Sequence, residues 1–91
     1  MDRRARAREL LSSALAEVEK ELSAPRTNLC PNQLGTARET LRGYLATLDT
    51  DALPPRRDRA EGLGRMILDS WPYDSPLGTA ILQAERAWRN C

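Results

Sequence analysis

The residues best suited to bind a partner are charged side chains at opposite ends of the first predicted helix. They are Arg3, Arg4, Arg6 and Arg8 near its start and Glu17, Glu19 and Glu21 near its end. A helix is stabilised by the opposite arrangement, because its amino end is partially positive and its carboxyl end partially negative. We therefore expect something outside this helix to compensate the gradient: an antiparallel helix, a partner with an acidic surface, or screening by solvent.

A second copy of the same helix would satisfy this gradient. Two antiparallel copies would set Arg4 and Arg8 of one chain beside two glutamates of the other. Those glutamates are Glu17 and Glu21, and the apolar seam between the helices would be Leu11, Leu15 and Val18. The sequence thus predicts a homodimer through this helix. The competing interpretation is that the helix packs only within its own bundle.

Groups that could perform catalysis are few. The chain has no histidine, so the usual general base and the usual partner of a catalytic nucleophile are missing. Two pairs of aspartates occur, Asp49 with Asp51 and Asp69 with Asp74. We expect them at solvated helix ends and loops. The prediction is therefore a protein that is not an enzyme and has no cofactor.

The two cysteines, Cys30 and Cys91, are too few for a disulfide scaffold. Without histidine, a zinc site would need carboxylates to complete its ligands, so no metal is expected. Neither cysteine has a base nearby in the sequence that would generate a thiolate. We expect two separate reduced thiols.

The segment around Pro72 and Pro76 is conformationally restricted. Trp71 and Tyr73 would lose little entropy on binding there, which suits an anchor for a partner protein. The alternative is that both aromatics belong to the core, with Trp71 and Trp88 in one cluster where the third helix meets the fourth.

DNA binding is the alternative function. Helices over 58–71 and 76–89 follow the order of a helix-turn-helix. The outward face of the last helix would carry Thr79, Gln83, Arg86 and Asn90. The connection contains prolines instead of the usual short glycine-containing turn, and the net charge is only +1. Nucleic acid is therefore the less favoured partner.

The elements that must position these residues are four helices. Apolar spacings of three and four residues predict helices over about 3–22, 32–48, 58–71 and 76–89, with no strand pattern. Expected start signals are Asn32, a capping box at Asp58 and Glu61, and Ser75 before Pro76. Gly35 and Gly43 each cost about 1 kcal/mol inside a helix, which favours a close helix crossing or a looser turn. The predicted fold is an all-α, compact antiparallel bundle forming a single domain over 1–91.

Composition fits a small globular protein. The chain has 91 residues, of which 41% are hydrophobic and 30% charged, and no apolar stretch approaches the length of a membrane-spanning helix. Arginine is almost the only basic residue, which is equally typical of a GC-rich bacterial genome. We expect a cytoplasmic protein-binding module, such as an adaptor, chaperone, antitoxin or immunity-type inhibitor, that acts by stoichiometric association. The alternative is a small DNA-binding regulator that uses the arginine-rich amino terminus and the last helix.

Overall fold

Four α-helices make up most of the part of the chain that the structure describes, and the predicted all-α fold is confirmed. A computed structural model describes residues 2–59, 62–72 and 74–91. The helices are α1 (Arg3–Ser23), α2 (Pro31–Asp49), α3 (Gly62–Ser70) and α4 (Pro76–Asn90), and a short 3-10 helix, η1 (Arg56–Asp58), precedes α3. The predicted bounds differ from these by at most one residue, except at the start of α3. Helix periodicity therefore located the elements well.

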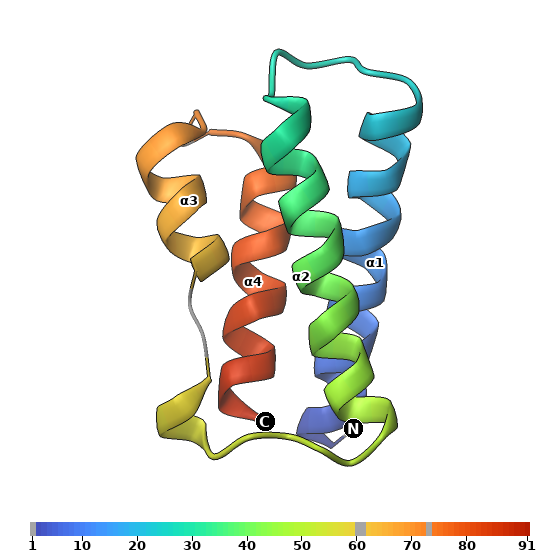
Figure 1. Cartoon of the computed structure of the whole chain (residues 1–91), viewed down its shortest axis with the longest axis vertical. Helices are drawn as coiled ribbons and strands as arrows, with labels where there is room; N and C mark the ends of the chain where they lie inside the picture. Colours follow the sequence, from blue (N-terminus) through green and yellow to red (C-terminus); the bar gives the residue numbers. More distant parts are fainter. Residues whose placement is uncertain (1, 60–61, 73) are drawn as a thin grey trace.

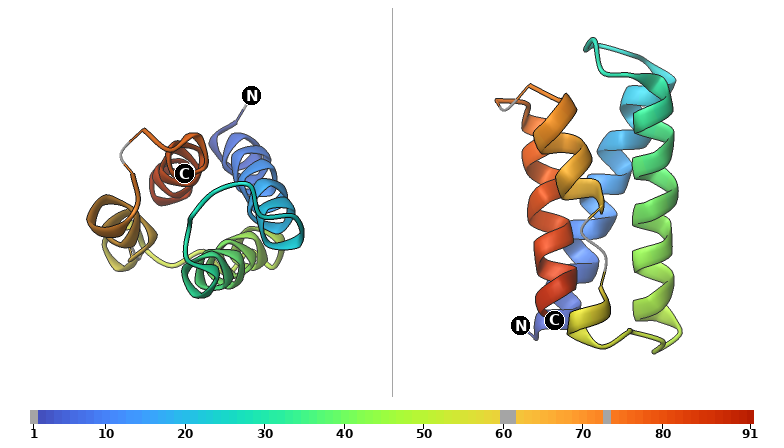
Figure 2. Two further views of the ribbon diagram at one scale, coloured as in Figure 1. Left: turned by 90° about the horizontal axis from the view of Figure 1, so that it is seen from above. Right: turned by 60° about the vertical axis from the view of Figure 1, so that its left-hand side comes forward.

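Helix α1 packs along both α2 and α4. Figure 1 shows α1 running antiparallel to these two helices, with the N- and C-termini at the same end of the bundle. The shorter α3 packs against α4 and, less extensively, against α2 (Figure 2). This topology puts the start of α1 beside the C-terminal ends of both α2 and α4, which decides where its arginines find partners.

The helix starts agree only partly with the predicted signals. Ser75 caps α4 as predicted, because its hydroxyl accepts a hydrogen bond from the Gly78 N–H. Asn32 is not a cap, since α2 already begins at Pro31. Helix α3 begins at Gly62 rather than at Asp58, which belongs to η1. The second residue of the predicted capping box, Glu61, lies outside the described residues. Helix α1 has a cap that was not predicted, the Asp2 carboxylate, which accepts from the Ala5 N–H at 2.7 Å.

Both tryptophans are buried, but they lie at opposite ends of the core. The Trp71 Nε1–H donates to Gln33 near the start of α2, whereas the Trp88 Nε1–H donates to Thr47 near its end. Nearly four turns of α2, about 20 Å, separate these two acceptors. Both rings belong to the same hydrophobic core, but the predicted place of this cluster, where α3 meets α4, is wrong for Trp88, because α4 carries it away from that junction.

The close helix crossing predicted at Gly35 and Gly43 is wrong. A Cβ built on either residue meets no atom within 4 Å, and α2 is continuous through both. A Cβ on Gly64 would instead lie 3.0 Å from Glu85 Oε1, and one on Gly78 would lie 3.2 Å from a side-chain carbon of α3. Close approach therefore occurs between α3 and α4.

Candidate functional site

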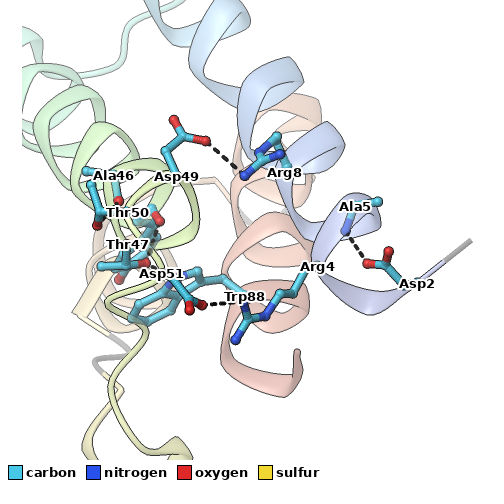
Figure 3. A network of polar contacts seen from close by, with 11 residues as sticks. Asp2, Arg4, Ala5, Arg8, Ala46, Thr47, Asp49, Thr50, Asp51 and Trp88 are labelled. Carbon is cyan, nitrogen blue, oxygen red and sulfur yellow. Dashed lines mark hydrogen bonds and ion pairs between the residues drawn. The ribbon is translucent and has the colours of Figure 1, made fainter.

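The first turns of α1 carry arginines on two different sides of the helix. The arginines on one of these sides form ion pairs with aspartates of the same chain. Arg4 donates to Asp51 at 2.6 Å, and Arg8 lies 2.9 Å from Asp49 (Figure 3). The hydrogen bond and charge of Asp51 raise the pKa of Arg4. Both aspartates stand at the C-terminal end of α2, so the antiparallel helix compensates this part of the charge gradient, as one of the expectations proposed.

The end of α2 is shaped so that its second aspartate reaches α1. Asp51 has a φ of 54°, in the left-handed region that favours glycine. The N–H of the next residue, Ala52, donates to the Thr47 carbonyl and closes the helix. This turn carries the Asp51 carboxylate out of the α2 helix and toward Arg4 (Figure 3).

The glutamates at the other end of α1 also have partners inside the chain. Glu21 accepts from the backbone N–H groups of Arg26 and Thr27 and from the Thr27 hydroxyl, at 2.8–2.9 Å. These hydrogen bonds lower the pKa of Glu21, the one from the Arg26 backbone most of all. Glu19 pairs with α2 at 3.0 Å, and Glu17 lies 3.6 Å from Lys20. Glu21 therefore fastens the loop after α1 and does not project toward a partner.

The apolar residues expected at a partner interface are mostly core residues. Leu11 and Val18 are fully buried within the single chain, and Leu15 is partly buried against the same core. The expected dimer seam is thus already covered by the chain's own helices. Association of two copies stays a prediction, and its seam would have to use other residues. Trp71 is buried rather than an exposed anchor, and Tyr73 lies outside the described residues.

The other side of the α1 start faces α4 and forms a groove, which we call the arginine groove. Its lining residues are Arg3, Arg6 and Leu10 from α1 and Gln83, Arg86, Ala87 and Asn90 from α4. Leu10 and Ala87 are partly buried against the core and form the apolar floor, while the arginines stand exposed around it. Its volume of about 410 Å³ accommodates several side chains rather than a single ion.

The arginines of this groove carry uncompensated charge. Arg3, Arg6 and Arg86 form no ion pair with any residue in the described ranges. Arg4 and Arg8, on the neighbouring side of the same helix, are both paired, and so are the arginines of α2. None of the residues that line the groove is acidic. The groove is therefore built to attract anionic groups.

Arg59 binds the C-terminal end of α4, the helix that forms one wall of the groove. Its guanidinium donates to the Trp88 and Arg89 carbonyls at 2.8 and 3.0 Å and to the Pro54 carbonyl at 2.9 Å. It also lies 5.8 Å from the centre of the Trp88 ring. A cation at this position satisfies carbonyls left free at the helix end and opposes the negative end of the helix dipole. The C-terminal end of α4 is thus closed by a base, whereas the end of α2 presents acids.

A second polar cluster is buried between α2, α3 and α4. Glu85 is only 4% exposed, and its carboxylate accepts from the Leu63 N–H at 3.2 Å, the Gly64 N–H at 2.9 Å and the Tyr44 hydroxyl at 2.6 Å. Burial and the contact with Glu85 raise the pKa of Tyr44. The Tyr44 ring stacks on Trp88 with 3.9 Å between ring centres. Glu85 thus supplies acceptors for the first turn of α3, so every contact of this carboxylate serves the fold.

The sequence-based interpretation singled out the polar residues of the arginine groove, but neither its apolar floor, Leu10 and Ala87, nor the association of the two helices around it. It placed Gln83, Arg86 and Asn90 on the outward face of the last helix, and all three are exposed. It treated Arg3 and Arg6 together with the paired arginines, because charge alone does not show which neighbour each one faces. The available signal was helical spacing, since residues 3, 6 and 10 share one side of a helix.

The described residues contain no group of three or more side chains that could hold a metal ion. None of the helices in the same ranges is long and apolar enough to cross a membrane. Comparison of the sequence with models of known families and with curated proteins found no match.

Proposed function

We propose that this protein is a binding module that associates stoichiometrically with an acidic segment of a partner protein through the arginine groove. The observation that carries the proposal is the set of three exposed arginines without ion pairs in the described ranges around an apolar floor. Guanidinium groups are rigid forks that match carboxylates with two parallel hydrogen bonds. Arginine is also among the residues enriched at protein interfaces.

The apolar floor favours a protein partner over nucleic acid. Leu10 and Ala87 offer carbon surface between the arginines, which resembles the apolar centre and polar rim of a protein interface. Duplex binding depends on many phosphate contacts, and this chain has a net charge of only +1. Gln83 and Asn90 on the exposed face of α4 could nevertheless form hydrogen bonds with base edges. A DNA duplex is therefore included as a probe in the test.

The proposal is tested with probes of defined chemistry and a ¹⁵N-labelled protein. The first probe is a synthetic amphipathic helix of about 20 residues with glutamates along one face. A matched peptide has each glutamate replaced by glutamine, and a third probe is a mixed-sequence duplex. Backbone amide shifts are followed at about physiological salt. We expect the acidic peptide to shift the amides of Leu10, Ala87 and their neighbours, and the glutamine peptide to shift them far less.

Variants then locate the binding surface. Reversing two groove charges, Arg3→Glu with Arg6→Glu, should abolish the shifts without changing the circular dichroism spectrum, because both side chains are exposed. The matched control, Arg26→Glu with Arg57→Glu, changes the net charge equally at exposed positions outside the groove and should bind as the wild type does. Equal losses in both double variants, or a tighter complex with the duplex than with the peptide, would overturn the proposal.

A further inference from the structure

A second groove, between α3 and α4, adjoins the arginine groove and has a different character. Leu68 of α3 lines it and is 72% exposed, the one large hydrophobic side chain among the described residues that stands in solvent. Leu82 of α4 lies on the same surface and is only partly buried. Arg86 lines both grooves, so the outer ridge of α4 separates them.

The two grooves differ in the chemistry that they accept. The α3/α4 groove is lined by Arg65, Arg86 and Arg89 as well as by the buried Glu85, and it differs from the arginine groove in the exposed apolar side chain of Leu68. An apolar side chain lying between Leu68 and Leu82 would cover carbon surface that is otherwise left to solvent. The arginine groove, by contrast, has no acidic lining and attracts carboxylates. A single occupant that covers both surfaces therefore needs acidic groups at one point and an apolar group at another.

We propose that the partner segment is an amphipathic acidic helix that crosses the outer face of α4. Its carboxylates bind in the arginine groove, and an apolar side chain about two helical turns away packs against Leu68 and Leu82. The spacing follows from the width of α4, because a helix with its side chains is about 10 Å across and two turns rise about 11 Å. This inference rests on the proposed function, since it specifies the ligand of that same surface.

The spacing is tested with peptides that differ only in the apolar position. The parent peptide carries a pair of glutamates and a leucine seven residues after them, and its matched peptide has alanine in place of that leucine. The protein variants are Leu68→Ala and the conservative Leu68→Met. Neither should unfold the protein, because the Leu68 side chain lies largely in solvent. Affinities are measured by fluorescence polarisation with the labelled peptides.

We expect leucine removal from the peptide, or Leu68→Ala in the protein, to weaken binding roughly tenfold, as the loss of one buried leucine contact predicts. Combining the two changes should weaken binding little further, because both remove the same contact. Leu68→Met should retain most of the affinity.

Three results would overturn the inference, the last of them together with the function on which it rests. If Leu68→Ala binds the parent peptide like the wild type while Arg3→Glu with Arg6→Glu abolishes binding, the arginine groove stands and the apolar anchor fails. If light scattering gives twice the 10.2 kDa chain mass and Leu68→Ala restores the monomer, a second copy covers Leu68 instead. If the arginine reversals leave binding intact while Leu68→Ala removes it, the proposed function itself fails.

Discussion

The C-terminal ends of α2 and α4 both lie beside the start of α1, yet they are completed in opposite ways. The end of α2 presents Asp49 and Asp51, which pair with two arginines of α1. The end of α4 is closed by Arg59, which donates to its last carbonyls. The arginines at the start of α1 therefore find acids at the end of α2, whereas no acid lines the groove that they form with α4.

This difference separates charge used for folding from charge available for binding. The arginines facing α2 are committed to ion pairs, whereas Arg3 and Arg6 stand near the carboxyl end of a helix, where the dipole tolerates cations without supplying a carboxylate. Paired surface charges add little to stability, and the unpaired ones add less. The unpaired arginines therefore cost the fold little free energy, and they could form ion pairs with the acidic side chains of a partner.

The largest expected effect concerns Glu85, which fixes α3 against the inner face of α4. Replacing Glu85 with alanine leaves the N–H groups of Leu63 and Gly64 and the Tyr44 hydroxyl without an acceptor in a buried site. Each unsatisfied buried donor costs about 1–3 kcal/mol, so we expect a loss of at least about 3 kcal/mol in the free energy of unfolding. Urea titration followed by far-ultraviolet circular dichroism measures it.

The neighbouring residue provides the control for this experiment. Arg86 follows Glu85 in the chain but is exposed, so Arg86→Ala should change the free energy of unfolding by less than about 0.5 kcal/mol. The two variants together contrast the inner and outer faces of one helix. A loss below about 1 kcal/mol for Glu85→Ala would show that water replaces the carboxylate and that α3 does not depend on it.

A smaller loss in the free energy of unfolding is expected on replacing Arg59, the residue by which the C-terminal end of α4 differs from that of α2. Arg59→Met keeps the aliphatic part of the side chain but removes three hydrogen bonds to carbonyls and the contact of the charge with the Trp88 ring. We expect a loss of about 2 kcal/mol, which lowers the thermal midpoint by about 10 °C in a domain of this size.

Arg59→Lys is the matched variant, because it restores the charge without the fork that reaches several carbonyls. It should recover only part of the loss in thermal midpoint. Full recovery would show that charge at the helix end matters and that the directed hydrogen bonds do not.

The sequence was a good guide to the helices and a poor guide to their contacts. Spacing, Ser75 and the prolines located the elements because these signals are local. The partners of Arg4 and Arg8 depend on which helix lies alongside, and no local signal records that. The predicted dimer used Leu11 and Val18, whereas packing within the chain already buries both.

The burial of Glu85 was indicated by helical periodicity, but its charge argued for a position in solvent. Glu85 follows Ile81 by four residues and precedes Trp88 by three, so periodicity places it at the edge of the buried face of α4. A charged residue at such a position is normally expected in solvent. What reverses the expectation is the start of α3, whose backbone N–H groups need an acceptor, and only the assembled structure brings them to Glu85.

The smallest expected effects lie at Asp51, where two contributions of similar size oppose each other. Asp51→Gly relieves a left-handed conformation that costs an ordinary residue roughly 1–2 kcal/mol and an aspartate less, but it removes the ion pair with Arg4. An exposed pair contributes under about 1 kcal/mol. Asp51→Asn removes the same charge while keeping a residue that tolerates this conformation. We therefore expect Asp51→Asn to be slightly less stable than the wild type, and Asp51→Gly to be equal to it or slightly more stable.

Salt separates the two contributions at Asp51. Added salt of about 1 M screens an exposed ion pair but leaves the backbone preference unchanged. The wild type should then lose its advantage over Asp51→Asn, while the difference between Asp51→Gly and Asp51→Asn stays constant in urea titrations at both salt concentrations. A deficit of Asp51→Asn that persists in high salt would mean that the Asp51 carboxylate does more than pair with Arg4 at the surface. The α2 side of the α1 start would then be an essential part of the fold, and the contrast with the arginine groove would be larger than the exposed geometry predicts.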